Sequence, residues 1–186
     1  MFIEPSVVSI IIAKIRSGTF RNIENFKLRG IYLLFLSAAI QFFLSFAKAR
    51  ELSFSILILE DLFIYLIFLS YLLIIIAILL NLNKAYMKVF LIGVVLNMAV
   101  ILANGGKMPV SLNGISGINQ EMELPDRQFD IKHTPVTEDT RLVYLSDILL
   151  IPKPYPLPKI LSVGDLFIMT GIFVFFQKEM LSEKKK

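Results

Sequence analysis

The sequence predicts an all-α polytopic membrane protein: a helical bundle of four to five transmembrane segments with one extracytoplasmic loop region. Hydrophobic residues make up 56% of the 186 residues and charged residues only 18%, and the mean hydropathy is +0.72. A soluble domain of this size could not bury so much apolar surface, so lipid must cover part of it. The apolar residues also gather into long segments separated by polar stretches.

These segments form a single predicted membrane domain, with apolar stretches at about residues 1–13, 30–47, 54–82, 89–103 and 160–177. The first would be about 20 Å long as a helix, which is short for a span. It is interpreted as a short tilted span, with a helix lying in the membrane interface as the alternative. The fourth ends at Asn104-Gly105-Gly106-Lys107-Met108-Pro109, a pattern typical of a helix C-terminus.

The loop of residues 105–159 is the only sizeable polar region, and it is rich in glycine and proline. Short β-like runs such as Arg141 to Leu145 favour a small β-hairpin. The alternating prolines from Pro152 to Pro158 favour extended chain.

The positive charges predict the orientation of the chain. Five cations and a single acid lie in Lys14 to Arg29, and the C-terminal tail ends in three lysines. Cations close to membrane spans mark the cytoplasmic side. We therefore expect a multi-pass protein of the cell membrane with a cytoplasmic C-terminus and an extracytoplasmic loop 105–159. Because the cations form no continuous basic face, no nucleic-acid partner is expected.

Composition also excludes several kinds of site. The chain has no cysteine and one histidine, His133, so a disulfide, a thiolate nucleophile and a cysteine- or histidine-rich metal site are excluded. No motif suggests a cofactor. Met1 to Ala13 lacks the basic start and the small-residue cleavage site of a signal peptide. The short chain without an inverted repeat argues against a transporter.

Two aspartates are the candidate catalytic residues. Asp165 lies inside the last apolar segment, where an ionisable side chain is costly and suggests function. Asp147 precedes it in the loop. Two carboxyls in close contact cannot both ionise easily, so one acid and one base could activate a water molecule. The alternatives are that Asp165 caps a helix N-terminus and that Asp147 is a solvated turn residue.

Further polar groups are predicted at the same outer depth and are candidates for binding: Asn97, Asn104, Lys107, Glu60 and Asp61. The two acids could instead cap the third helix. Asn97 could form hydrogen bonds between helices. Asn104 and Lys107 could hold an anionic head group, or simply follow the end of a helix.

The last apolar segment resembles a known catalytic motif. In Leu161 to Gly171, the residues Asp165, Ile168 and Gly171 match the final motif of bacterial lipoprotein signal peptidases, Phe-Asn-x-Ala-Asp-Ser-x-Ile-x-x-Gly. Ser162 and Gly164 stand where that motif has Asn and Ala. A weaker similarity connects the same stretch to the Gly-x-Gly-Asp motif of presenilin-type proteases.

The other catalytic aspartate of the signal peptidases lies in a Val-Val-Asp-Phe-Ile context, to which Leu145 to Leu149 is similar. The resemblance covers the C-terminal quarter of the chain. It implies an aspartyl endopeptidase near the outer leaflet, with Asp147 and Asp165 as its catalytic pair and a membrane-anchored protein as its substrate. The family's Asn-x-x-Asp-Arg motif has no counterpart after the fourth segment.

The whole chain resembles an uncharacterised family of small bacterial multi-pass membrane proteins, a domain of unknown function. The resemblance rests on the basic loop after a short N-terminal helix, on Asn-Gly-Gly-Lys-Met-Pro at 104–109, and on Ser-x-Gly-Asp at 162–165. It implies a membrane location and no known activity.

Beside the disfavoured transporter, two classes of function remain. The first is the aspartyl peptidase-like enzyme, which requires Asp147 and Asp165 to meet in a pocket open to water. The second is a non-catalytic binding or scaffold protein whose outer loop recognises a lipid head group or a protein partner. Membrane lipid is an expected partner in both. The substrate and the oligomeric state leave no signature in the sequence.

Overall fold

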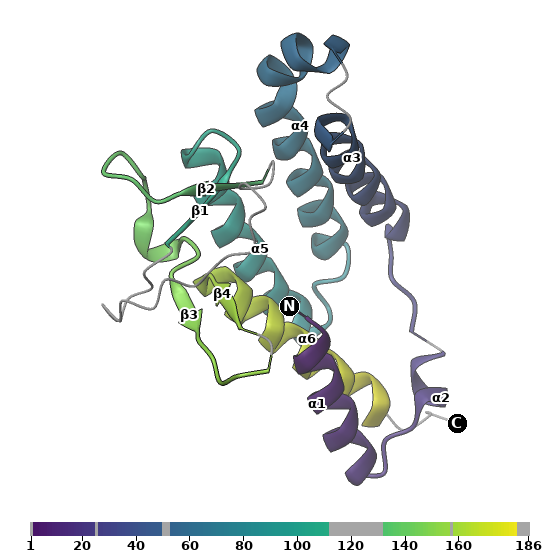
Figure 1. Cartoon of the computed structure of the whole chain (residues 1–186). Helices are drawn as coiled ribbons and strands as arrows, with labels where there is room; N and C mark the ends of the chain where they lie inside the picture. Colours follow the sequence, from purple (N-terminus) through teal and green to yellow (C-terminus); the bar gives the residue numbers. More distant parts are fainter. Residues whose placement is uncertain (1, 25, 50–52, 112–131, 157, 182–186) are drawn as a thin grey trace.

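The protein is mostly helical, with a small strand region between its last two long helices (Figure 1). A computed structural model describes residues 2–24, 26–49, 53–111, 132–156 and 158–181, without the side chains of 48, 49 and 53–61. The helices are α1 (Ile3–Ile15), α2 (Phe20–Ile23), α3 (Ile31–Ala49), α4 (Ser53–Leu79), α5 (Ala85–Ala103) and α6 (Val163–Leu181). The other elements are β1 (Met108–Val110), β2 (His133–Pro135), the 3₁₀ turn η1 (Val143–Leu145), β3 (Leu149–Ile151) and β4 (Lys159–Leu161).

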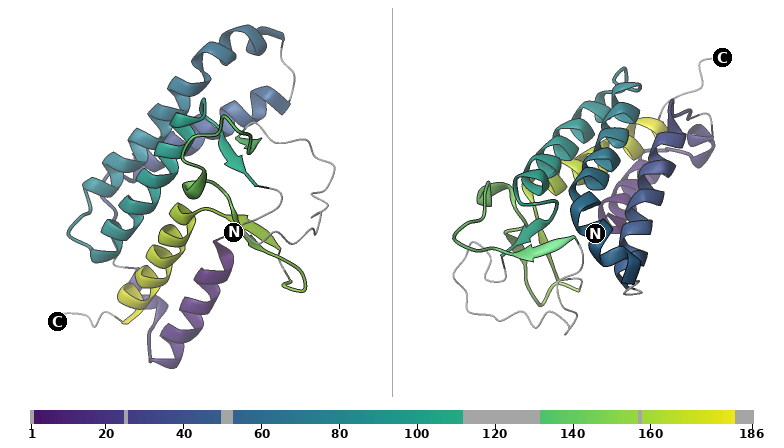
Figure 2. Two further views of the ribbon diagram at one scale, coloured as in Figure 1. Left: turned by 90° about the vertical axis from the view of Figure 1, so that its left-hand side faces the viewer. Right: turned by 90° about the horizontal axis from the view of Figure 1, so that it is seen from above.

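The long helices pack as a series of neighbours. α3 packs on α4, α4 on α5, α5 on α6, and α6 on α1, as the two further views in Figure 2 also show. The α4–α5 connection is only five residues long, 80–84, so these two helices run antiparallel. The buried Asn81 fixes this turn, because its amide donates to the carbonyl oxygens of Ala77 and Arg29. The chain before α3 is thereby held against the end of α4.

Two apolar clusters hold the helices together. One joins α3, α4, α5 and β1 through Leu44, Phe63, Ile67, Val100, Ile101 and Met108. The other joins α4 and α5 through Ile78, Tyr86, Met87 and Val94, with Ile168 and Phe175 of α6 packed against it. Side chains of this size each stabilise the fold by about 1.5–3 kcal/mol when fully buried.

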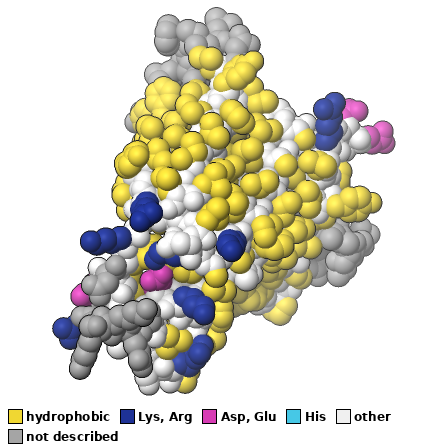
Figure 3. All heavy atoms as spheres, turned by 180° about the vertical axis from the view of Figure 1, so that it is seen from behind, with side chains coloured by type: hydrophobic (Ala, Val, Ile, Leu, Met, Phe, Trp, Pro, Cys, Tyr) yellow, Lys and Arg dark blue, Asp and Glu magenta, His cyan; other side chains and the backbone are white. Residues whose placement is uncertain are grey.

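Large apolar faces remain exposed outside these clusters. Phe35 and Phe42 of α3 are 70% and 71% exposed, and Tyr65 of α4 is 68% exposed. Figure 3 shows hydrophobic side chains over much of one face, with most of the visible lysines and arginines toward one end. Among the described residues, Leu62–Leu79 of α4 and the whole of α5 are long and apolar enough to cross a membrane. Apolar patches of this extent indicate contact with a membrane or a partner.

The strand region differs from the predicted hairpin. Residues 143–145 form the 3₁₀ turn η1, and the antiparallel hairpin is β3 with β4. β4 also occupies the start of the predicted fifth apolar segment, so α6 begins at Val163 rather than 160. β1 pairs in parallel with β2. Residues 112–131 of the predicted outer loop lie outside the described residues.

α5 ends where the sequence predicts. Gly105 and Gly106 follow it with φ of 69° and 87°, a backbone conformation that glycine adopts without strain. The Gly106 amide donates to the Ile101 carbonyl oxygen, so an otherwise unpaired carbonyl of the last turn is satisfied. The chain then turns directly into β1.

Candidate functional site at the start of α6

The first residues of α6 form a capping box around Asp165. The Asp165 amide donates to Ser162 Oγ at 3.0 Å, and the Ser162 amide donates to Asp165 Oδ2 at 3.0 Å. This reciprocal pair satisfies two of the four free N–H groups at a helix start. The alternative interpretation of Asp165, as a first-turn residue at a helix N-terminus, is therefore correct for its position. Its side chain is nevertheless buried, with 6% exposure.

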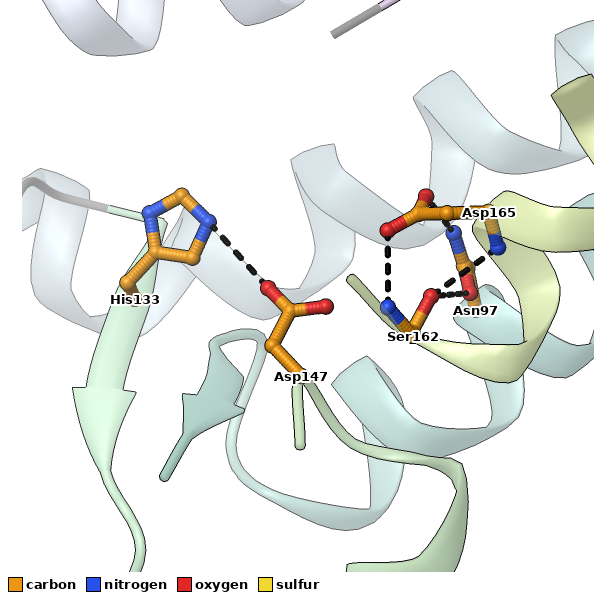
Figure 4. A network of polar contacts seen from close by, with 5 residues as sticks. All are labelled: Asn97, His133, Asp147, Ser162 and Asp165. Atoms are coloured by element: carbon orange, nitrogen blue, oxygen red, sulfur yellow. Dashed lines mark hydrogen bonds and ion pairs between the residues drawn. The ribbon is translucent and has the colours of Figure 1, made fainter. Parts of the chain in front are cut away.

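Asn97 of α5 joins this capping box from the neighbouring helix. Its Nδ2 donates to Asp165 Oδ1 at 3.0 Å, and its Oδ1 accepts from Ser162 Oγ at 3.0 Å. Both oxygens of the Asp165 side chain thus accept a hydrogen bond. An ionised carboxylate is an acceptor without donors, so this environment suits a carboxylate. Figure 4 shows the three side chains clustered where α6 begins.

Glycines allow the two helices to approach this closely. A Cβ atom on Gly164 would lie 2.7 Å from the carbonyl oxygen of Gly93 and would collide with the Asn97 amide group. A Cβ on Gly93 would lie 2.6 Å from the carbonyl oxygen of Gly164. Each glycine therefore faces the backbone of the other helix. Small residues at a helix crossing permit this close packing.

Asp147 is held beside β1 by backbone hydrogen bonds. Its amide donates to the Pro109 carbonyl oxygen at 3.0 Å, and its own carbonyl oxygen accepts from the Ser111 amide at 2.9 Å. The neighbouring Ser146 and Ile148 are buried. Asp147 is therefore fixed in a buried segment and is not a solvated turn residue.

The Asp147 carboxyl group is buried and incompletely paired. Its Oδ2 lies 3.9 Å from His133 Nε2, and its Oδ1 is buried without a hydrogen-bond partner. Burial, and secondarily the charge of Asp165, raises the pKa of Asp147 to about 7. In Figure 4 the carboxyl oxygen that does not face His133 points toward the side on which Ser162 and Asp165 lie.

The structure thus brings both candidate catalytic residues into one region. Asp147 and Asp165 influence each other electrostatically, and Tyr71 of α4 lies within electrostatic range of both. One acid has a pKa near neutrality, whereas the other sits among hydrogen-bond donors. Two carboxyls in different environments are the usual basis for separate acid and base roles.

The remaining predicted site residues lie elsewhere. The Asn104 side chain forms hydrogen bonds with both backbone groups of Arg141 and is not part of the Asp165 cluster. Lys107 is half-buried just before β1. Glu60 and Asp61 belong to α4, and their side chains lie outside the described part of the chain. In that part, no group of three or more His, Asp or Glu side chains could hold a metal ion.

The sequence interpretation missed three residues of this region. Ser162 carries a local signal, because Ser-x-x-Asp before an apolar run is a capping-box pattern. His133 stands out in the sequence only as the single histidine, and nothing near it in the sequence connects it to Asp147. Tyr71 lies in a stretch that is apolar except for the neighbouring Ser70, and it gives no signal.

Comparison with known proteins places the chain in a family without a known function. A family model described as "Family of unknown function (DUF5317)" matches residues 25–177. An uncharacterized protein of Thermotoga maritima is 28% identical over 176 residues, which cover 95% of this chain and 90% of that protein. No solved structure matches the chain.

Proposed function

Because the chain belongs to the DUF5317 family of unknown function, we propose a function from its site alone: an aspartyl peptidase-like enzyme of the cell membrane. The exposed apolar faces and the two helices long enough to span a bilayer support a membrane location. The proposed multi-pass topology, with a cytoplasmic C-terminus and an extracytoplasmic loop 105–159, follows from the positions of the cations.

One observation carries the enzymatic proposal. Asp147 combines a pKa of about 7 with a buried oxygen that has no hydrogen-bond partner, and its charge is coupled to a second aspartate. A buried polar atom without a partner costs about 1–3 kcal/mol. A buried carboxyl group that destabilises the fold in this way, and whose pKa lies near neutral pH, is a candidate for acid–base chemistry.

The proposed reaction divides the work between the two carboxyls. The Asp165 carboxylate takes a proton from a water molecule as the water oxygen attacks the carbonyl carbon of a peptide. The protonated Asp147 donates a hydrogen bond to the carbonyl oxygen, where negative charge develops. The carbon–nitrogen bond then breaks, and the leaving nitrogen receives the proton that Asp165 had accepted. This is the division of roles in a carboxyl pair that shares one proton.

The proposed substrate is a membrane-anchored protein cut near the outer leaflet. Asp165 lies in the first turn of α6, and Asp147 lies beside β1, which begins shortly after the end of α5. Both acids therefore lie toward one end of the helices. A site at this depth would have lipid on one side and water on the other, as the hydrolysis of an anchored substrate requires.

The first test is complementation in cells depleted of lipoprotein signal peptidase. Wild type, Asp147→Asn and Asp165→Asn would be expressed, and the cleavage of a lipoprotein precursor followed on gels. Asp139→Asn is the matched control, because Asp139 is an exposed aspartate of the same loop. We expect cleavage by wild type and by the control only. A folded, membrane-inserted wild type that never cleaves the precursor would exclude this substrate class.

A second candidate function is non-catalytic binding through the loop. Both oxygens of Asp165 are already occupied by the capping box and by Asn97, an arrangement that also suits a purely structural role. In this case a photo-reactive amino acid at Tyr155, which is 41% exposed, would cross-link to a protein or a lipid head group. The same amino acid at Asn83, exposed in the α4–α5 turn, would not capture that partner.

A further inference from the structure

The turn before Asp147 carries two apolar side chains that point out of the protein. Leu142 is 48% exposed, and Tyr144 is 85% exposed. Leu145, in contrast, packs against the apolar cluster that includes Val100 and Met108. The turn is thus anchored inward through one side chain while two others remain uncovered by the described residues.

The turn is held at a fixed position relative to the end of α5. Asn104, directly after α5, accepts a hydrogen bond from the Arg141 amide and donates one to the Arg141 carbonyl oxygen, both at 2.9 Å. Its Nδ2 also donates to Val100 within α5 at 2.8 Å. The 3₁₀ turn η1 itself packs on α5 and α6. The depth of α5 in a bilayer would therefore set the depth of this turn.

The backbone of Leu142 is unusual for an apolar residue. Its φ of 55° and ψ of 38° place it in the left-handed region, which residues other than glycine, asparagine and aspartate rarely adopt. The Asn104 contacts immediately before it, and the hydrogen bond from the Leu145 amide to the Leu142 carbonyl oxygen, hold it there. A leucine therefore stands where glycine would fit without strain.

We infer that Leu142 and Tyr144 form a membrane anchor that inserts into the bilayer interface at the C-terminal end of α5. Tyrosine favours this depth because its ring is apolar and its hydroxyl group is polar. The adjacent Arg141 is exposed and lies where lipid phosphates would attract it. α5, to which the turn is fastened, itself exposes apolar side chains, including Ile92 and Val95.

The anchor gives the loop a role in positioning the candidate site. Asp147 follows Tyr144 by three residues, and the buried Ser146 lies between them. An anchored turn would hold Asp147 at the boundary between lipid and water. The inference rests on the membrane placement of α5 in the proposed function and is independent of the acid–base chemistry.

The absence of tryptophan from the chain makes a direct test possible. Tyr144→Trp and Val95→Trp each introduce a single fluorescent probe, and each protein would be reconstituted into phosphatidylcholine vesicles. The lipids carry bromine, a contact quencher, either near the head group or near the chain end. We expect Tyr144→Trp to lose most fluorescence with bromine near the head group, and Val95→Trp with bromine near the chain end.

The two probes separate the possible failures. If Val95→Trp is not quenched by either lipid, α5 is not in the bilayer and the membrane placement itself is wrong. If Val95→Trp is quenched but Tyr144→Trp responds only to aqueous iodide, the turn faces water and the anchor is overturned. If neither iodide nor bromine quenches Tyr144→Trp, this side chain is covered by protein, and the proposed membrane anchor is likewise overturned.

Discussion

At the scale of single residues, burial sets the chemistry of Asp147. A buried carboxyl without enough hydrogen-bond donors is more stable with its proton than without it. Asp165, 18 residues further along the chain, is equally buried but receives donors from Ser162 and Asn97. The same side chain type therefore occupies two different environments. The donors, rather than the depth of burial, distinguish the two aspartates.

This difference predicts a pH-dependent effect of Asp147→Asn on stability. The pKa of Asp147 rises from 3.8 to about 7 on folding, so the folded state holds the proton more tightly than the unfolded chain. The protonated Asp147 therefore stabilises the folded protein fully below its pKa in the unfolded chain, and this stabilisation is lost as the pH rises through about 7. Asparagine cannot ionise, so the variant does not lose this stabilisation. Its free energy of unfolding relative to that of wild type should therefore rise by up to about 3 kcal/mol between about pH 5 and pH 8.

Thermal unfolding of the purified protein in detergent, followed by circular dichroism at both pH values, measures this effect. Asp139→Asn is again the control, since its side chain is exposed and its replacement should shift the melting temperature little at either pH. If the difference in melting temperature between Asp147→Asn and wild type were the same at both pH values, the buried position of this carboxyl would be contradicted.

At the scale of elements, the α5–α6 crossing decides whether the Asp165 cluster can form. Asn97 reaches Asp165 only because Gly93 and Gly164 let the helices touch through their backbones. α1 packs on another part of α6, where Ser9 Oγ donates to the Phe173 carbonyl oxygen at 2.7 Å. Glu4 of α1 also pairs with Lys159 of β4, the strand that leads into α6. Helix α6 is thus fixed by both neighbours, through polar contacts as well as apolar packing.

We expect Gly164→Ala to destabilise the protein by about 1–3 kcal/mol, the usual cost of forcing extra atoms into a close-packed site. Its Cβ would meet the Gly93 backbone and the Asn97 amide group, neither of which can move freely. Gly171→Ala is the matched control on the same helix, because its Cβ would meet the Phe90 ring at 3.0 Å, and a ring can shift. Equal melting temperatures for the two variants would contradict the backbone contact.

At the scale of the whole molecule, one group of exposed cations lies near the C-terminal ends of α1 and α6. Exposed cations such as Lys14, Arg21 and Lys178 lie near the α1 and α6 C-termini, and the end of α6 is fastened there by the Lys84–Glu179 ion pair at 2.9 Å. The loop with Asp147 lies toward the other end of α5. These cations are among those from which the orientation is predicted.

The orientation can be tested directly, because the chain has no cysteine. Asp139→Cys and Lys178→Cys place single thiols at exposed positions in the loop and near the end of α6. A membrane-impermeant maleimide should label the first in intact cells and the second only after permeabilisation. The opposite result would invert the topology and place the candidate site on the cytoplasmic side.

Local pattern was enough to predict the mostly helical fold and the end of α5. The long apolar runs of this chain form most of α3, α4, α5 and α6, and Asn104-Gly105-Gly106 stops a helix through its own backbone geometry. The position of Asp165 at a helix N-terminus was likewise predicted as an alternative, and the signal for its missed partner Ser162 is also local, because the two residues are three apart. These features depend on residues close together in the sequence, so the sequence by itself determined them.

Only the tertiary structure decided the surroundings of Asp147. Hydrogen bonds with Pro109 and Ser111 hold it in a buried position. His133 of β2 lies 3.9 Å from its carboxyl group, and Tyr71 of the distant helix α4 lies within electrostatic range. The hairpin was wrongly predicted near residues 141–145, because Leu145 packs into the apolar cluster and the chain there turns instead of extending. Burial and long-range pairing are properties of the assembled helices, and no local pattern of residues encodes them.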